Sequence, residues 1–444
     1  MFNFTQKWNF PSNNNGAITG IADSGIETFK GTPIKSLARE ICQNSLDAAK
    51  HSGEPVRIDF SRFEIDSNKI PDKKSLENAL TRSLEFWSMQ KSDKAKSFFK
   101  KAISVIQSPR ISCLRISDFN TTGLTGSRAE YNSPWCNLIK SSGASDKSGS
   151  NGGSFGIGKS APFACSSLRT IFYSTADCEG ICASQGVARL TSFKDKNNET
   201  TQGTGFYGNR QNTPNYSQFS LDPNYHRKDD DFGTDIFILG FSGDDEWKRE
   251  IVTSILDGFL YAIYNGFLIV NVDEITISKD TLPSLIVTYK PFLQEHADEY
   301  YQTFVDTKLS RTFNKSLDDD PEIQGELTLR LMIMPDYHRR VAMIRQTGMK
   351  IKDKGNISGL IPFAGTLFIE GDSINSYLRG LENPQHLDWE VERAENKARL
   401  NPPAPENKSI TLYFLIEITL KSLYRTVHLL TSVNKNFSVL FFIF

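Results

Sequence analysis

The spacing of apolar residues is the sequence feature that most constrains the fold of this chain. Over residues 32–50, apolar side chains recur at helical spacing, which predicts a helix with one buried face. Residues 56–65 begin with strict alternation instead, which predicts a strand. We also expect a charged helix over 74–107 and strands over 113–117, 168–175, 186–193 and 233–241. This mixture of helices and strands predicts an α+β fold for the first 241 residues.

The pattern changes near residue 242, where we expect a domain boundary. Three elements follow it: a helix over 245–266, an amphipathic strand or hairpin over 267–278 and a strand over 326–334. They indicate a second, smaller α/β domain over residues 242–408. The apolar tail, residues 409–444, is interpreted either as the end of this domain or as an aberrant terminus. Its apolar runs are shorter than the roughly 18 residues that a membrane-spanning helix needs.

Composition excludes several classes of protein. The chain has 444 residues, with 51 Lys and Arg against 52 Asp and Glu, so its formal net charge is −1. A nucleic-acid binder that depends on a basic charge over the whole chain is therefore excluded, whereas a local basic patch is not. Six cysteines are too few for a disulfide scaffold, and the N-terminus has no secretory pattern. We therefore expect a cytoplasmic protein without a membrane partner.

The histidines and cysteines show no metal-binding spacing. The six histidines are scattered along the chain, and Cys178 and Cys182 have no second pair of ligands close to them in the sequence. We therefore expect every histidine to be an ordinary surface or core residue.

The first predicted helix carries a polar motif. In EICQNSLDA, Glu40, Asn44 and Asp47 share one helix face, beside the apolar stripe and not within it. A carboxylate there can polarise a water molecule, and a carboxamide oxygen one turn away can coordinate a hard cation such as Mg²⁺. Polar helix faces are usually only solvated, so this motif needs support from elsewhere in the chain.

Two loops add that support. ISDFNTTG places Asp118 directly after an apolar strand, where its carboxylate can accept a hydrogen bond from the amino group of a base, although such aspartates are also common turn formers. SNGGSFGIGKS carries glycines whose backbone N–H groups can converge on a phosphate. Residues 153–160 also match a P-loop pattern, but the polar segment KSSGASDKSGSNG before them cannot be the buried strand that a P-loop requires.

Taken together, the motifs resemble the ATP-binding domain shared by DNA gyrase, heat-shock chaperones, histidine kinases and MutL, the GHKL superfamily. EICQNSLDA, ISDFNTTG and GGSFGIGKS are similar to its boxes and come in its order, and Gly233 and Thr234 open a strand as a Gly-Thr pair does there. The resemblance covers residues 15–241 and is strongest, in style, to prokaryotic MORC/MutL-like ATPases. It implies a Bergerat-type ATP-binding α/β sandwich with an N-terminal strap and a lid over residues 119–158.

The resemblance also implies a role for each matching residue. Glu40 would be the general base for the hydrolytic water, and Asn44 would bind Mg²⁺. Asp118 would take the adenine amino group with support from Thr234, and Asp47 would support the site. The residues expected around the phosphates are Gly153, Gly156, Ile157, Gly158, Lys159 and Ser160.

The second box departs from the family pattern. Asn120 stands where the first glycine is expected, and Gly123 comes one residue late. The hinge of the lid is therefore expected to differ here, and Gly123 is the residue assigned to it.

The second domain resembles the transducer of gyrase, MutL and MORC-type ATPases in its position and coarse pattern. In that group a basic residue reaches the γ-phosphate, and RQTGMKIKDKG offers Arg345, Lys350, Lys352 and Lys354. We choose Lys350, with a solvated basic loop as the alternative.

The function implied is a slow, Mg²⁺-dependent ATPase switch. ATP would close two protomers into a clamp that acts with DNA or a nuclease partner, in a phage-defence (antiviral) setting that the family suggests. The first alternative is a non-hydrolysing, ATP-gated interaction module for a separate effector. The second is a heat-shock-type chaperone.

Overall fold

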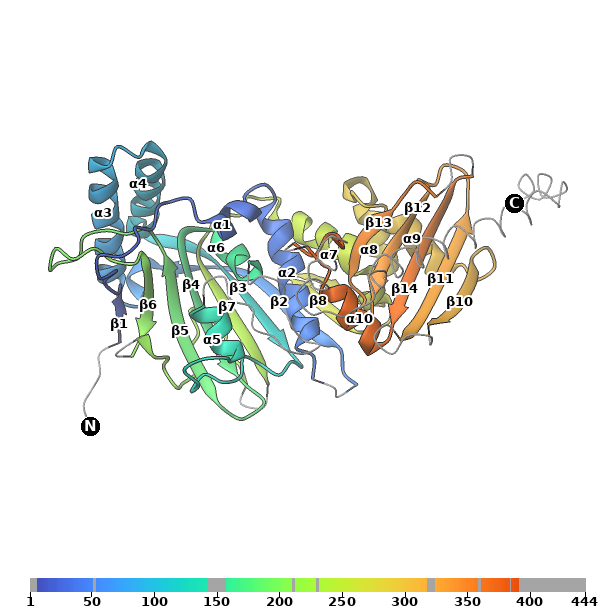
Figure 1. Cartoon of the computed structure of the whole chain (residues 1–444), viewed down its shortest axis with the longest axis horizontal. Helices are drawn as coiled ribbons and strands as arrows, with labels where there is room; N and C mark the ends of the chain where they lie inside the picture. Colours follow the sequence, from blue (N-terminus) through green and yellow to red (C-terminus); the bar gives the residue numbers. More distant parts are fainter. Residues whose placement is uncertain are drawn as a thin grey trace, which may run out of the picture. The chain divides into compact units, whose positions relative to one another are not determined.

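The computed structural model describes residues 6–50, 53–141, 157–209, 212–228, 231–317, 324–357, 361–383 and 385–390 (Figure 1). The chain divides into two compact units, which are treated separately. Unit 1 comprises Met1–Asp146, Phe155–Ile255 and Ile263–Leu285, and unit 2 comprises Lys147–Ser154, Leu256–Ala262 and Ile286–Phe444. Both units combine helices with a mixed sheet, which is compatible with the predicted α+β class. Among the described residues, no helix combines the length and apolarity that crossing a membrane requires.

Unit 1 is built on a nine-stranded sheet with the order β1-β6-β5-β4-β7-β3-β2-β8-β9. Its strands are β1 (Lys7–Asn9), β2 (Val56–Asp66), β3 (Arg110–Phe119), β4 (Ser166–Ala176), β5 (Cys182–Arg189), β6 (Thr204–Gly208), β7 (Gly233–Phe241), β8 (Leu268–Val272) and β9 (Ile275–Ile277). Within this described sheet β2 and β8 are parallel, and the other neighbours are antiparallel. The order places β7 and β3 side by side at its centre, so the end of β3 lies beside the start of β7.

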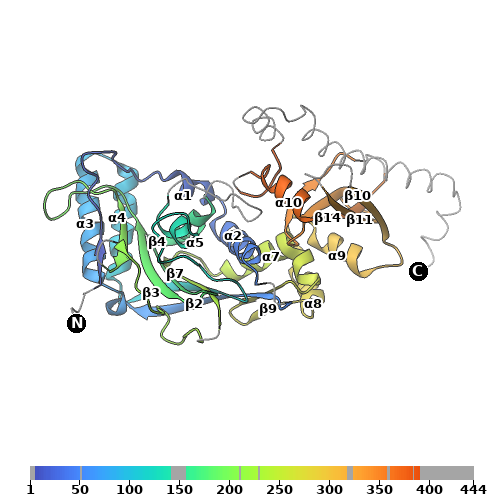
Figure 2. The same ribbon diagram turned by 60° about the horizontal axis from the view of Figure 1, so that its bottom comes forward.

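The helices of unit 1 follow from the apolar patterns of the sequence. They are α1 (Ser24–Phe29), α2 (Pro33–Asp47), α3 (Lys73–Met89), α4 (Asp93–Gln107), α5 (Pro134–Ile139), the short 3₁₀ turn η2 (Gly158–Ser160) and α6 (Ala161–Ala164). Proline in the first turn of α2 suits a helix start, and Leu37 and Ile41 are buried as predicted. Figure 2 shows α2 and α5 on one side of the sheet. The helices predicted over 32–50 and 74–107 are confirmed, the second as the pair α3 and α4.

Residues 6–30, predicted to form a strap, contain a strand and a helix. Strand β1 pairs with β6, and Trp8 packs edge-on against Phe172 of β4 with ring centroids 5.7 Å apart. Helix α1 packs against η2 and α6, where a Cβ added to Gly25 would lie 2.4 Å from Ser160 Oγ. The segment is therefore packed into unit 1 at β1 and at α1, whereas residues 14–19 between them are exposed.

Unit 2 is built on a five-stranded sheet with the order β10-β11-β14-β12-β13. Its strands are β10 (Arg311–Leu317), β11 (Gly325–Ile333), β12 (Arg340–Arg345), β13 (Lys350–Lys354) and β14 (Phe363–Glu370), of which β12 and β14 are parallel. Helix α9 (Ala297–Val305) packs on β14 and β11, and α10 (Asp372–Arg379) packs on the same two strands. Buried Leu329, Leu367 and Phe304 contribute to this core.

The two units do not separate at the predicted boundary near residue 242. Helix α7 (Trp247–Tyr264) contains residues of both units and has a non-helical conformation at Phe259. The hairpin of β8 and β9 follows α7, yet β8 pairs in parallel with β2 and so completes the first sheet. Unit 1 therefore continues to Leu285, through part of α8 (Leu282–Tyr289). Periodicity identified this hairpin but contained no information on which sheet it joins.

Candidate functional site

Asp118, near the end of β3, is the centre of a hydrogen-bonded group in unit 1. Its Oδ1 accepts from the Thr234 backbone N–H at 2.7 Å and from the Thr121 hydroxyl at 3.0 Å. Its Oδ2 accepts from the Ser45 hydroxyl of α2 at 3.0 Å. Helix α2, the end of β3 and the start of β7 therefore meet at one carboxylate.

The surroundings of Asp118 have opposing effects on its charge. Burial raises the pKa of this carboxyl, while the Arg227 guanidinium and the hydrogen bonds from Thr234, Ser45 and Thr121 act in the opposite direction. Arg227 is itself held in a buried ion pair with Asp235 of β7, at 2.7 Å. The carboxylate is thus partly withdrawn from water but supplied with donors.

Gly233 allows β7 to start this close to Asp118. Its φ is +152°, and an added Cβ would lie 2.1 Å from the Asp118 carbonyl oxygen and 2.7 Å from its Oδ1. A side chain at this position would therefore displace the carboxylate or the strand. The Gly-Thr pair that the sequence singled out thus has a steric reason in the first residue and a hydrogen-bonding reason in the second.

Glu40, on α2, lies against Gly158 at the end of the predicted lid. Its side chain is buried, and a Cβ added to Gly158 would lie 1.9 Å from Glu40 Oε2. Glycine therefore lets the backbone of η2 approach this carboxylate closely. The prediction that Glu40 lies beside the buried stripe was wrong, because α6 packs against α2 and extends the buried face.

Lys159 and Ser160 contact protein groups near the end of the predicted lid. The Lys159 ammonium donates to the carbonyl oxygen of Asn137 at 2.9 Å and to that of Ser141. Burial, together with the nearby Arg189, lowers the pKa of Lys159 to about 8. The Ser160 hydroxyl accepts from the Arg189 guanidinium at 2.8 Å. In this arrangement the lysine ties η2 to α5.

The loop after β3 shows how the chain accommodates its departure from the family pattern. Asn120 has φ +60°, a left-handed conformation that asparagine adopts more readily than most residues. Gly123 has φ +65°, and an added Cβ would lie 2.7 Å from the Ala176 carbonyl oxygen at the end of β4. Asn120 therefore takes a backbone conformation that glycine usually supplies, and Gly123 allows close packing on β4.

The other predicted residues of unit 1 differ in their exposure to solvent. Asn44 is exposed one turn from Glu40, and Asp47 is half-buried at the end of the same helix. Ile157 is half-buried directly before η2. Gly153 and Gly156 lie outside the described residues.

Lys350, chosen to contact a phosphate, lies in unit 2 on β13. It is buried, and its ammonium is 2.6 Å from Glu295 and 3.2 Å from Asp353. The alternatives Arg345 and Lys352 are likewise ion-paired, with Glu382 at 3.1 Å and with Asp388. Ion pairs within unit 2 therefore hold these three basic groups. The alternative prediction of a solvated basic loop is wrong for them.

Several site residues were missed by sequence reasoning. Ser45 lies on the buried face of α2, and its bond to Asp118 was not foreseen. Thr121 and Arg227 were not assigned any role. Thr121 had a usable signal, since a hydroxyl three residues after a strand-end aspartate often bonds that carboxylate. Arg227 had none, because its proximity depends on the tertiary fold.

The chain matches no protein-family model, and no curated protein matches its sequence.

Proposed function

We propose that unit 1 binds ATP with Mg²⁺ and hydrolyses it slowly, as a GHKL-type molecular switch with a Bergerat-type α/β sandwich. The observation that carries the proposal is the bond of 2.7 Å from the Thr234 N–H to Asp118, which joins two of the motifs across 116 residues. A second contact between motifs, Glu40 against Gly158, supports it.

The group around Asp118 suits recognition of an adenine amino group. A carboxylate oxygen has two lone pairs, and Oδ2 has one described donor, Ser45. Oδ2 can therefore accept a further hydrogen bond from an exocyclic amine. Thr234 and Thr121 fix the other oxygen, so the carboxylate is oriented before a base arrives. Preorganisation of this kind reduces the ordering that binding requires.

Helix α2 would supply the groups for the phosphate end of the nucleotide. The exposed Asn44 carboxamide oxygen is a ligand suited to Mg²⁺, which, when bound, neutralises phosphate charge. Glu40 would take a proton from the water whose oxygen attacks the terminal phosphorus, while the bond to the ADP oxygen breaks. The backbone of η2 at Gly158 would close on this side of the phosphates.

Nucleotide binding would act through the segments that touch these residues. The strap contacts η2 through Gly25 and Ser160, so a change at the phosphate end reaches α1 directly. In the proposed cycle, ATP orders the lid and strap of two protomers into a homodimeric clamp that acts with DNA or a nuclease partner in antiviral defence. The switch depends on contacts made to ATP and not to ADP.

One observation favours a second function, an ATP-gated interaction module without turnover. Lys350, the residue proposed to contact the γ-phosphate, is buried and paired with Glu295 and Asp353. A chain that keeps this lysine paired would bind nucleotide through unit 1 without the stabilisation that a cation gives the transition state. Phosphate release measured with and without DNA separates the two functions.

The first experiment measures nucleotide affinity, using a fluorescent ATP analogue with Mg²⁺. Asp118→Asn should weaken binding about tenfold or more, because the amide places a donor where an acceptor is needed. Asp93→Asn is the matched control, since its side chain is 95% exposed at the start of α4. Equal affinity of the two variants would remove Asp118 from the binding site.

The second experiment measures turnover in variants that keep the nucleotide bound. Glu40→Gln should slow phosphate release about a hundredfold while binding persists, and Glu64→Gln, on an exposed part of β2, should not. Asn44→Ala should lower the affinity measured with Mg²⁺ but not the affinity measured without it. Wild-type turnover in Glu40→Gln would disprove the assigned base.

A third experiment tests the approach of η2 to Glu40. Gly158→Ala adds a Cβ at 1.9 Å from Oε2 and should slow turnover about a hundredfold, because a displacement of about 1 Å can have that effect on catalysis. Gly31→Ala is the control, since a Cβ there meets no atom within 4 Å. If both variants turn over at the wild-type rate, the close contact has no part in catalysis.

A further inference from the structure

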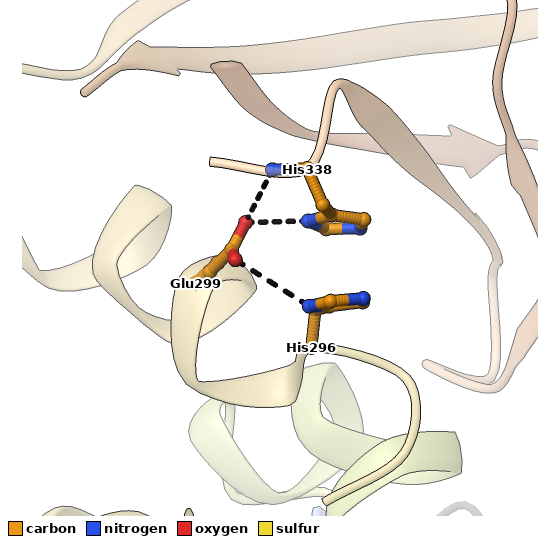
Figure 3. A group of neighbouring side chains, drawn as sticks. All are labelled: His296, Glu299 and His338. Atoms are coloured by element: carbon orange, nitrogen blue, oxygen red, sulfur yellow. Dashed lines mark hydrogen bonds and ion pairs between the residues drawn. The ribbon is translucent and has the colours of Figure 1, made fainter. Parts of the chain in front are cut away.

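Unit 2 contains a cluster of two histidines and one glutamate that is separate from the groups considered so far. His296 directly precedes α9, Glu299 lies in its first turn, and His338 lies in the turn between β11 and β12. One ligand atom from each residue lies within 4.8 Å of the others. Figure 3 shows the two imidazole rings, one above the other, with the Glu299 carboxylate facing the same edge of both.

The two rings direct equivalent nitrogens at one carboxylate. His296 Nδ1 is 3.4 Å from Glu299 Oε1, and His338 Nδ1 contacts Oε2. The rings are stacked, with centroids 3.5 Å apart and an angle of 13° between their planes. The His338 backbone N–H also donates to Oε2 at 3.2 Å, which fixes the carboxylate relative to the turn. Three ligand atoms of the kinds that transition metals prefer therefore lie close together.

The hydrogen bonds behind His338 determine which of its nitrogens carries a proton. The Tyr300 hydroxyl donates to Asp353 Oδ1 at 2.9 Å and is 3.1 Å from His338 Nε2. A hydroxyl has one proton, so Nε2 must be the donor to the tyrosine oxygen. The second nitrogen of a metal-binding histidine is commonly held by such a partner.

This assignment leaves Nδ1 of the neutral ring with a lone pair that faces a carboxylate oxygen. Two acceptors in contact repel each other unless a proton or a metal ion lies between them. A metal ion satisfies both acceptors without requiring the ring to be charged.

We propose that unit 2 binds one divalent transition-metal ion, Zn²⁺, through His296 Nδ1, the Glu299 carboxylate and His338 Nδ1. Two imidazoles and a carboxylate are a ligand set for zinc and leave a fourth position for water. The ion enters from the side of His296, whose side chain is 45% exposed, against 12% for His338. Because stacked parallel rings cannot both direct Nδ1 at one ion, the exposed His296 ring tilts away on binding. The ion then ties the start of α9 to the β11–β12 turn.

The test is a titration of the metal-stripped full-length chain with Zn²⁺ in competition with a chromophoric chelator. Excess Mg²⁺ is kept in the buffer so that it occupies the sites built from oxygen ligands. The Zn²⁺ uptake that is measured then reports the sites that contain nitrogen ligands. We expect one Zn²⁺ per chain. This result does not depend on nucleotide binding, so it separates the zinc site from the proposed ATPase.

Variants assign the ion to the three residues. His296→Ala removes an exposed ligand with little effect on folding and should weaken Zn²⁺ binding about tenfold or more, as should Glu299→Gln. His226→Ala is the matched control, since His226 is exposed in unit 1. Tyr300→Phe, which removes the partner of Nε2, should weaken binding about tenfold.

Spectroscopy gives a second readout at the ligands themselves. In the wild-type chain, Zn²⁺ should shift the NMR signals of His296 and His338 in the pattern of coordination through Nδ1, and should leave His226 unchanged. A wild-type chain that takes up no Zn²⁺ overturns the proposal. So does Zn²⁺ binding that is equal in wild type, His296→Ala and Glu299→Gln.

Discussion

Asp118 in unit 1 and Glu299 in unit 2 are both partly buried carboxylates, but their neighbours differ in kind. Asp118 faces donors: a backbone N–H and the hydroxyls of Ser45 and Thr121. Glu299 faces two imidazole nitrogens, one of which carries a lone pair when Tyr300 and Asp353 are hydrogen-bonded as described. The first arrangement is complete as a protein structure, whereas the second has two acceptors in contact unless a proton or a metal ion lies between them.

The comparison indicates that the hydrogen-bonding partners of a carboxylate, more than its burial, determine what it can bind. A carboxylate fixed by neutral donors is an oriented acceptor for an incoming N–H group, such as that of a base. A carboxylate opposed by nitrogen lone pairs is one ligand of an incomplete metal site. The following predictions test whether the two regions differ in this way.

The largest expected effect concerns the buried ion pair beside Asp118. Arg227→Ala leaves Asp235 buried without its partner and should lower the free energy of unfolding by about 3–5 kcal/mol. Arg110→Ala, which breaks the exposed pair with Glu64, should lower it by less than about 1 kcal/mol. Urea unfolding followed by tryptophan fluorescence suits this test, because four of the five tryptophans, Trp8, Trp87, Trp135 and Trp247, lie in unit 1. Equal losses would mean that the surroundings of Asp118 are not preformed by buried charge.

The next effect concerns Asp118 itself. Asp118→Ala leaves the Thr234 N–H without its acceptor and should lower the free energy of unfolding by about 2–3 kcal/mol, since an unsatisfied buried donor is costly. The same fluorescence measurement applies. A loss within error of zero would show that water replaces the carboxylate and that the group is not preformed.

Asp257 of unit 2 is a carboxylate that, like Asp118, accepts hydrogen bonds from backbone N–H groups. Its shifted pKa predicts how the stability of unit 2 depends on pH. Its Oδ2 accepts from Gln294 at 3.1 Å, yet burial raises its pKa from 3.8 to about 6. Because the folded state holds the proton more tightly, its stabilising contribution is complete below about pH 4 and is lost as pH rises through about 6. Between pH 4 and pH 7 the loss should be about 2 kcal/mol.

Asp257→Asn should remove this pH dependence, whereas Asp372→Asn, at an exposed position in α10, should keep it. Hydrogen exchange of peptides from α9 and β14, measured between pH 4 and 7 with the intrinsic rates corrected, reports the stability of unit 2. A pH dependence that persists in Asp257→Asn would assign it to another group.

The smallest effect is expected for Glu299 in the metal-free chain. Glu299→Gln keeps an oxygen for the His338 backbone N–H and offers an amide N–H to His296 Nδ1, so stability should change by less than about 1 kcal/mol. Hydrogen exchange of α9 in the presence of a chelator provides the measurement. A loss of several kcal/mol would show that a proton already joins Glu299 to the rings, and the contrast with Asp118 would fail.

Sequence and structure agree best where a motif and its contacts lie on one element. The α2 motif and the strand 233–241 were predicted from local pattern, because helical and strand periodicities are local properties, and the Gly-Thr pair was identified from the family resemblance. The burial of Glu40 was not predictable in this way, since it depends on α6 packing from 121 to 124 residues further along the chain. Long-range pairing also explains why unit 1 extends past the predicted boundary near residue 242, because β8 pairs with β2.

The histidines show the limit of spacing as a signal. Their positions in the sequence contain one local cue, His296 three residues before Glu299, and His338 lies 39 residues after that glutamate. The expectation that every histidine is an ordinary surface or core residue came from the absence of a familiar motif. A ligand set completed by a turn between two strands contains no such motif.

From the sequence alone, many of the elements of unit 1, fewer of those of unit 2, and the residues able to do chemistry could be predicted, because these depend on side-chain type and short-range periodicity. Tertiary structure alone decided which of these residues meet: Thr234 with Asp118, Gly158 with Glu40, and His338 with Glu299. It also decided that Lys159 and Lys350 are held by protein acceptors. Strand pairing and helix packing bring together residues that are distant along the chain, and no local pattern specifies those distances.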